Sequence, residues 1–222
     1  MKPELRRIGT GASPLMVIDD FSGDAAAIVD IAAALAPFPR AQTHYPGLRR
    51  TIGPHDDAAK AYVTRTLKAA APFIGGAFGA ASFELIDASF SIVTDAPDAL
   101  RPGQRIPHFD STDPAYLAIL HYLSDTPGTA FYRHRATGIE AVSEAHRAAF
   151  LAAAASDAAA ARGYIAASNA GFERIAEVAG RSDRLIIYQG RLLHSGIIPE
   201  GMPLSADPRV GRLTANLFVR IA

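Results

Sequence analysis

Residues 184–196 read RLIIYQGRLLHSG, an apolar segment followed by a turn and then by a histidine. Arg184–Tyr188 mixes β-branched and aromatic side chains, which predicts a strand. Gln189 and Gly190 are typical turn residues. His194 follows this strand and turn. A side chain at such a position can contribute to a site formed at the ends of neighbouring strands.

Further strands are expected on both sides of this stretch. Runs of apolar, aromatic and β-branched residues separated by Asp, Pro and Gly turns predict one long strand or two short ones at Ser82–Thr94, and strands at Ala115–Leu123, Thr129–His134 and Arg212–Ile221. Because these strands follow one another without intervening helices, they favour a sandwich or barrel over a doubly wound sheet.

Helical sequence is expected in three places. Phe21–Pro37 has apolar positions at helical spacing behind Ser22 as the N-cap. Asp56–Ala71 predicts a second helix, closed by Pro72. Glu140–Gly180 contains strong helix formers almost throughout and is interpreted as a helical insertion that either covers the core or forms a partner-binding arm.

The composition excludes several classes of protein. The 222 residues are 49% hydrophobic, and no repeat or linker divides them, so we expect a single domain at 1–222 with an N-terminal helical part at 1–80. The 22 basic and 22 acidic side chains cancel, which speaks against nucleic acid or a membrane surface as partner. Without cysteines there is no thiolate metal site. No apolar run has the length of a membrane span, and we expect a soluble, cytoplasmic protein.

A candidate metal site is built from two motifs. In Pro107–Asp110, PHFD, an extended backbone places His108 and Asp110 on one face. His194 adds a second imidazole. Two histidines and one carboxylate form the facial triad that binds Fe(II) and leaves three positions open, although the same donors can hold zinc with a water.

A candidate carboxylate site follows in GRLT, residues 211–214. Arg212 and Thr214 share one face of the last predicted strand, where a guanidinium and a hydroxyl can grip a carboxylate. Arg209 is nearer to His194 along the chain and is the second choice. His44, His55 and His146 have no acidic partner at ligand spacing and are interpreted as surface residues.

Four segments together resemble a known family. PHFD, AYLAILHYLSDTPGTAFYRH, RLIIYQGRLLHSG and GRLTANLFV stand in the order found in the Fe(II)- and 2-oxoglutarate-dependent dioxygenases, closest to the prolyl-hydroxylase-like branch. The resemblance implies a mainly β fold with flanking helices, namely a double-stranded β-helix (jelly-roll, cupin-like) core at 83–221. The helical insertion at 140–180 would interrupt this core, and the N-terminal helices would buttress it.

The resemblance also implies roles for individual residues. The catalytic residues that would bind Fe(II) are His108, Asp110 and His194. The residues that would bind 2-oxoglutarate, the co-substrate, are Arg212, Thr214 and Tyr122. Phe218 matches an aromatic residue that closes the pocket floor.

The implied activity is hydroxylation of a C–H bond in an unidentified small-molecule or peptidyl substrate, with release of succinate and CO2. Ascorbate is an expected additive in vitro, and a homodimer is left open. Arg133–Arg135 hints at an acidic substrate, although a solvated strand end is the better explanation of this cluster. Two alternatives remain: a cupin-like metal enzyme that does not use 2-oxoglutarate, and a non-catalytic metal-binding or interaction module on the same fold.

Overall fold

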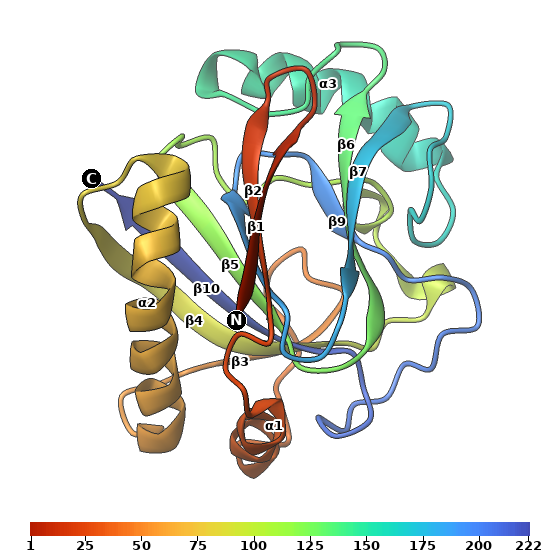
Figure 1. Ribbon diagram of the computed structural model, residues 1–222. Helices are drawn as coiled ribbons and strands as arrows, with labels where there is room; N and C mark the ends of the chain where they lie inside the picture. The colour runs from red at the N-terminus through yellow and green to blue at the C-terminus, as the bar shows by residue number, and fades with distance from the viewer.

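The strands form two antiparallel sheets in the computed structural model, which describes all residues from 1 to 222 (Figure 1). The larger sheet has seven strands in the order β1-β2-β8-β5-β10-β4-β3, and the smaller sheet has three in the order β7-β6-β9. The strands are β1 (Lys2–Ile8), β2 (Ser13–Asp19), β3 (Gly47–Thr51), β4 (Phe83–Val93), β5 (Tyr116–Tyr122), β6 (Thr126–His134), β7 (Phe172–Gly180), β8 (Leu185–Gln189), β9 (His194–Gly196) and β10 (Leu213–Ile221). The helices are α1 (Ala25–Ala34), α2 (Asp57–Phe78) and α3 (Glu144–Ala160), with short 3-10 turns η1 (Pro97–Ala99) and η2 (Pro102–Gln104).

From β4 onward, the chain passes back and forth between the two sheets. β4, β5, β8 and β10 lie in the larger sheet, whereas β6, β7 and β9 lie in the smaller one. An antiparallel bridge between His108 and His194 adds a short fourth segment to the smaller sheet, between β4 and β5 in sequence. This path is that of a double-stranded β-helix, so the predicted jelly-roll fold class is confirmed.

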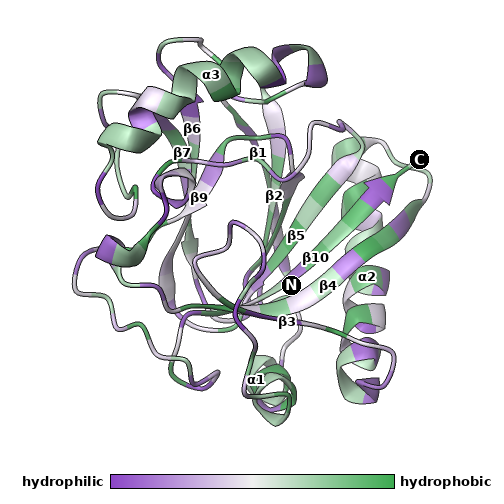
Figure 2. Cartoon of the chain, turned by 180° about the vertical axis from the view of Figure 1, so that it is seen from behind, coloured by the Kyte–Doolittle hydropathy of each residue, from purple (hydrophilic) through white to green (hydrophobic).

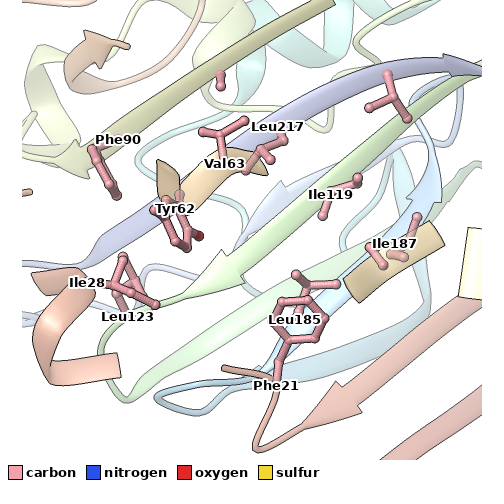
Figure 3. Packing of buried hydrophobic residues seen from close by; sticks show 14 of the residues in the cluster. Phe21, Ile28, Tyr62, Val63, Phe90, Ile119, Leu123, Leu185, Ile187 and Leu217 are labelled. Atoms are coloured by element: carbon pink, nitrogen blue, oxygen red, sulfur yellow. The ribbon is translucent and has the colours of Figure 1, made fainter. Parts of the chain in front are cut away.

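The main apolar core lies between the larger sheet and the helices α1 and α2 (Figure 3). The side chains of β5 alternate between the two faces of the larger sheet. Leu117 and Ile119 belong to the core that faces the helices, and Ala118 belongs to a second cluster between the sheets. Tyr62 and Val63 of α2 pack into the helix-facing core. β5 and β10 are apolar over most of their length (Figure 2), as expected for central strands.

The N-terminal part differs from the sequence-based expectation. Residues 1–80 were expected to be helical, but they also supply β1, β2 and β3 to the larger sheet. β1 is an exposed edge strand, KPELRRI, and lacks a clear apolar alternation. The N-cap of α1 is Asp24, whose carboxylate accepts a hydrogen bond from Ala27 N at 3.1 Å, and is not Ser22. Ser22 instead donates its hydroxyl hydrogen bond to Asp183.

The second helix continues through Pro72, where an end was expected. α2 runs to Phe78 and ends at Gly79, which has the left-handed φ of 69° that favours glycine. Ile74, beyond the proline, is fully buried in the core. Tertiary packing of this last part of the helix outweighs the local cost of the proline.

Only part of Glu140–Gly180 is helical. α3 occupies Glu144–Ala160, and Phe172–Gly180 forms β7, paired with β6. Pairing supplies backbone partners that outweigh the helix propensity of this stretch. Phe150 of α3 joins the apolar cluster on the smaller sheet, so the helix covers that sheet. No helix in the chain is both long and apolar enough to cross a membrane.

Candidate metal centre and its cavity

His108, Asp110 and His194, here called the metal triad, converge on one point. One potential ligand atom from each residue lies within 4.8 Å of the others. Asp110 Oδ1 is 3.8 Å from His108 Nε2, and Asp110 Oδ2 is 3.6 Å from His194 Nε2. The His194 side chain is only 6% exposed, but that of His108 is 47% exposed. A metal ion at this point would therefore be reached from the His108 side.

Backbone pairing holds the triad in place. His108 and His194 exchange two backbone hydrogen bonds of 2.9 Å, and Asp110 N donates to Gly190 O at 2.7 Å. The His194 ring is oriented by a further bond from Nδ1 to Leu192 O at 2.7 Å. Because a carbonyl can only accept, Nδ1 carries the proton, and Nε2 keeps the lone pair that a metal needs.

The protonation of the triad also suits a metal. Burial lowers the pKa of both His108 and His194 to about 4, and the proximity of His194 adds to the effect on His108. Burial raises the pKa of Asp110, while the charges of His108 and Arg49 oppose that rise. Both imidazoles are thus neutral near pH 7, which is the form that binds metals.

The triad lies in the wall of a cavity of about 410 Å³. Strands of both sheets and the loop before β3 contribute to its lining. Its ionisable and hydrogen-bonding side chains include Thr43, His44, Tyr45, Arg49, Asp87, Ser91, Gln104, His108, Asp110, Tyr116, Thr129, Tyr164, Tyr188, His194, Ser195, Arg212, Thr214 and Asn216. A cavity of this volume fits small molecules.

One end of the cavity holds a buried guanidinium without a carboxylate partner. Arg212 is 5% exposed, and its only hydrogen bond runs from Nη2 to Gly128 O at 2.9 Å. Its Nε is buried without any partner, and so is the hydroxyl of Tyr45 in the same lining. Thr214 lines the cavity beside them. Buried polar atoms in proteins are nearly always paired, so these orphans indicate a place for a ligand.

Two residues that the sequence analysis considered for the carboxylate lie outside this end of the cavity. Tyr122, expected to bind the co-substrate carboxylate, does not line the cavity; it is packed in the cluster between the sheets, and its hydroxyl donates to Thr129 Oγ1 at 2.7 Å. Tyr45 takes its place in the lining. Arg209, the second choice for the carboxylate, is paired with Asp30 on the surface and is 55% exposed.

Other residues that were singled out also find their places. Phe218 lines the cavity. His44 is exposed, as expected, and it also lines the cavity. Arg133 pairs with Glu140 and Glu173, and none of the residues 133–135 lines the cavity. No sequence pattern marked Tyr45 or Arg49, because both lie between the first two expected helices, where the sequence predicts neither a helix nor a strand.

Comparison with known proteins places the chain in a family. The model of a family of unknown function, DUF6445, matches residues 1–219. The chain belongs to DUF6445. A search of curated proteins found no match to this DUF6445 chain.

Solved structures share the fold of the DUF6445 chain. The epimerase SnoN, in complex with Fe3+, alpha ketoglutarate and nogalamycin RO, has a TM-score of 0.54 at 13% identity, over 95% of this chain and 80% of SnoN. HygX from Streptomyces hygroscopicus, with nickel, 2-oxoglutarate and hygromycin B bound, has a TM-score of 0.53 at 17% identity, over 95% of this chain and 83% of HygX. A prolyl hydroxylase from Trichoplax adhaerens has a TM-score of 0.52 at 11% identity, over 93% of this chain and 82% of the hydroxylase. The fold is thus that of the Fe(II)- and 2-oxoglutarate-dependent oxygenases, as the sequence motifs predicted.

Proposed function

We propose that this DUF6445 chain is an Fe(II)- and 2-oxoglutarate-dependent oxygenase that hydroxylates a C–H bond. The observation that carries the proposal is the buried guanidinium of Arg212, which has no carboxylate partner and an unpaired Nε, in the same cavity as the metal triad. A metal site alone fits many reactions. Here the metal site shares a small cavity with the buried Arg212 guanidinium, which has no carboxylate partner in the protein. This combination fits a co-substrate that binds the metal at one end and offers a carboxylate to Arg212 at the other.

The donor set fits iron. Two neutral imidazoles and one carboxylate, all from neighbouring backbone segments, are the donor set of the facial triad, and an Fe(II) held by them would keep three positions for other ligands. When bound, Fe(II) would supply the site at which O2 is activated together with the co-substrate. The reaction balances with one oxygen atom entering the C–H bond as a hydroxyl group and the other entering succinate, as 2-oxoglutarate loses CO2.

The chain's own residues would hold the co-substrate at its far end. The guanidinium of Arg212 and the hydroxyls of Thr214 and Tyr45 offer donors to the distal carboxylate of 2-oxoglutarate. Gly196 permits this arrangement, since a Cβ there would lie only 3.2 Å from Arg212 Nη2. The apolar cluster behind this end of the cavity, with Tyr122 and Phe131, keeps water away from the ion pair.

An anaerobic titration tests the proposal. Fe(II)-loaded protein is titrated with 2-oxoglutarate, and the visible charge-transfer band of a chelated keto acid is recorded. We expect a saturable band that disappears in His194→Ala through loss of metal, and in Arg212→Ala through loss of co-substrate with iron retained. The matched control is Arg209→Ala, which removes an exposed arginine of the same segment and leaves the band unchanged.

Each alternative has its own outcome in this titration. Bound iron without a band in the wild type would refute the use of 2-oxoglutarate and favour a cupin-like metal enzyme. No bound iron would favour a non-catalytic module. A normal band in Arg212→Ala would remove the role assigned to this arginine.

A further inference from the structure

The end of the cavity near Asp110 carries an ion pair with no assigned role. Arg49 Nη2 donates to Asp87 Oδ2, and Arg49 Nε donates to Ser89 Oγ at 3.0 Å. The guanidinium carbon also lies 5.6 Å from the centre of the Phe218 ring. Arg49 is thus held from several sides, with its side chain 19% exposed and that of Asp87 32% exposed. A fixed ion pair at a cavity wall is a surface that a ligand can recognise.

A continuous series of contacts connects this pair to the metal triad. Asp110 and Tyr116 meet over Gly190, where a Cβ would lie 3.2 Å from Asp110 Cβ and 2.7 Å from Tyr116 Cδ1. The Tyr116 ring stacks on Phe218 at 5.4 Å between centres. Phe218 in turn lies opposite Asp87 in the pairing of β10 with β4. The ion pair therefore stands one aromatic layer away from the metal ligands.

The pair lies apart from the expected co-substrate end. Arg212, directly before β10, and Phe218, within β10, are six residues apart, about 20 Å along an extended strand, and both line the cavity. A dicarboxylate that reaches from the metal to Arg212 leaves the region around Arg49 and Asp87 free. The substrate that is hydroxylated has room in this region.

The charges at this end restrict what can bind. Apart from His44, the metal triad and Arg212, the only residues in the cavity lining with a side chain that is charged near pH 7 are Arg49 and Asp87, and their charges cancel. A ligand with only a negative charge would be attracted by Arg49 but repelled by Asp87, and the reverse holds for a ligand with only a positive charge. A ligand that carries both charges satisfies both side chains.

We propose that Arg49 and Asp87 form the substrate subsite of this enzyme and that the substrate is a small zwitterion of the amino-acid type, an inference that rests on the proposed function. Arg49 Nη1 and Asp87 Oδ1 make no hydrogen bond and are free to take the carboxylate and the ammonium group, respectively. Tyr116 and Phe218 provide an apolar wall for the rest of the molecule. The cavity of about 410 Å³ must also hold the co-substrate, which limits the substrate to a small molecule.

Ligand-observed NMR tests the subsite by binding, without turnover. The twenty standard L-amino acids are titrated singly, first into the metal-free chain and then into the chain with Zn(II) and 2-oxoglutarate. For each amino acid that binds, the N-acetyl form, which is an anion, and the methyl ester, which is a cation, are titrated as well. We expect at least one amino acid to bind, and both masked forms to bind about ten-fold more weakly or worse.

Two charge-removing variants then separate recognition from folding. Asp87→Asn removes the repulsion of anions, so the N-acetyl form should gain affinity relative to the free amino acid. Arg49→Gln removes the repulsion of cations, so the methyl ester should gain relative affinity. These opposite gains cannot come from misfolding, and Arg209→Gln, with an exposed guanidinium outside the cavity, should leave all preferences unchanged.

The outcomes are distinguishable from those of the proposed function. Failure of all twenty amino acids to bind in both arms, or equal binding of free and masked forms, would overturn the subsite. The subsite would also be overturned if Asp87→Asn and Arg49→Gln lost affinity for the free amino acid and both masked forms to the same extent. Amino-acid binding to the metal-free chain together with the absence of a 2-oxoglutarate band would uphold the subsite and refute the oxygenase.

Discussion

Replacing Arg212 with methionine should make the ligand-free protein more stable and, at the same time, unable to bind its co-substrate. The guanidinium is 5% exposed, has no carboxylate partner and keeps one donor, Nε, unpaired. A buried donor without a partner costs about 1–3 kcal/mol. Removing a buried charge in favour of an apolar side chain of similar volume stabilises by about 1–4 kcal/mol in favourable cases.

The substitution removes little that stabilises the folded protein. Arg212 donates one hydrogen bond to Gly128 O, but this carbonyl also accepts from Ile197 N at 2.9 Å and is therefore not orphaned in the variant. We expect Arg212→Met to raise the free energy of unfolding by about 1–3 kcal/mol. In a chain of this length, each kcal/mol corresponds to about 2–4 °C in melting temperature.

Urea unfolding and thermal melting, each with and without Zn(II) and 2-oxoglutarate, measure both effects. In the wild type, 2-oxoglutarate at about 100 times its Kd adds about 2.7 kcal/mol, and in Arg212→Met it adds nothing. Arg209→Met serves as the control and should behave like the wild type in both measurements. A ligand-free Arg212→Met that is less stable than the wild type would refute the reasoning, because it would mean that the guanidinium is satisfied within the protein.

Three further predictions follow from contacts in the structure. Gly196→Ala should weaken 2-oxoglutarate binding by about ten-fold in calorimetry and leave metal binding intact, since the new Cβ would press on Arg212 at 3.2 Å; unchanged binding would mean that the guanidinium shifts freely. Tyr62→Phe should lower the free energy of unfolding in urea by about 1–3 kcal/mol, because it removes the 2.9 Å bond to the buried Nδ1 of His121, and a neutral effect would contradict this. The metal-free chain should lose stability as pH falls from 6.5 towards 4, because the unfolded chain takes up protons on the metal-triad histidines, whose pKa is about 4 in the folded state; urea midpoints that stay constant over this range would contradict it.

Local patterns were sufficient for five strands, β4, β5, β6, β8 and β10. Segments such as Arg184–Tyr188 and Ala115–Leu123 are apolar and short, and they are strands in the structure with small changes at their ends. The same periodicity of two explains why His108 and Asp110 approach one point. Phe172–Gly180 was interpreted as helix because its residues favour that state locally, and only the pairing with β6 makes it a strand.

The sequence by itself located the strands β4, β5, β6, β8 and β10 through local periodicity, and it named the three residues that converge as a metal triad. The class of fold came from short motifs that resemble those of a known family. Only the tertiary structure placed Arg212 in the cavity and Arg209 on the surface, left Tyr122 out of the lining that contains Tyr45, and placed Arg49 against Asp87 in the cavity. Those choices depend on burial and on partners from distant parts of the chain. Whether a charged side chain is left unpaired in a cavity or paired on the surface is a property of the packed fold, which no local pattern contains.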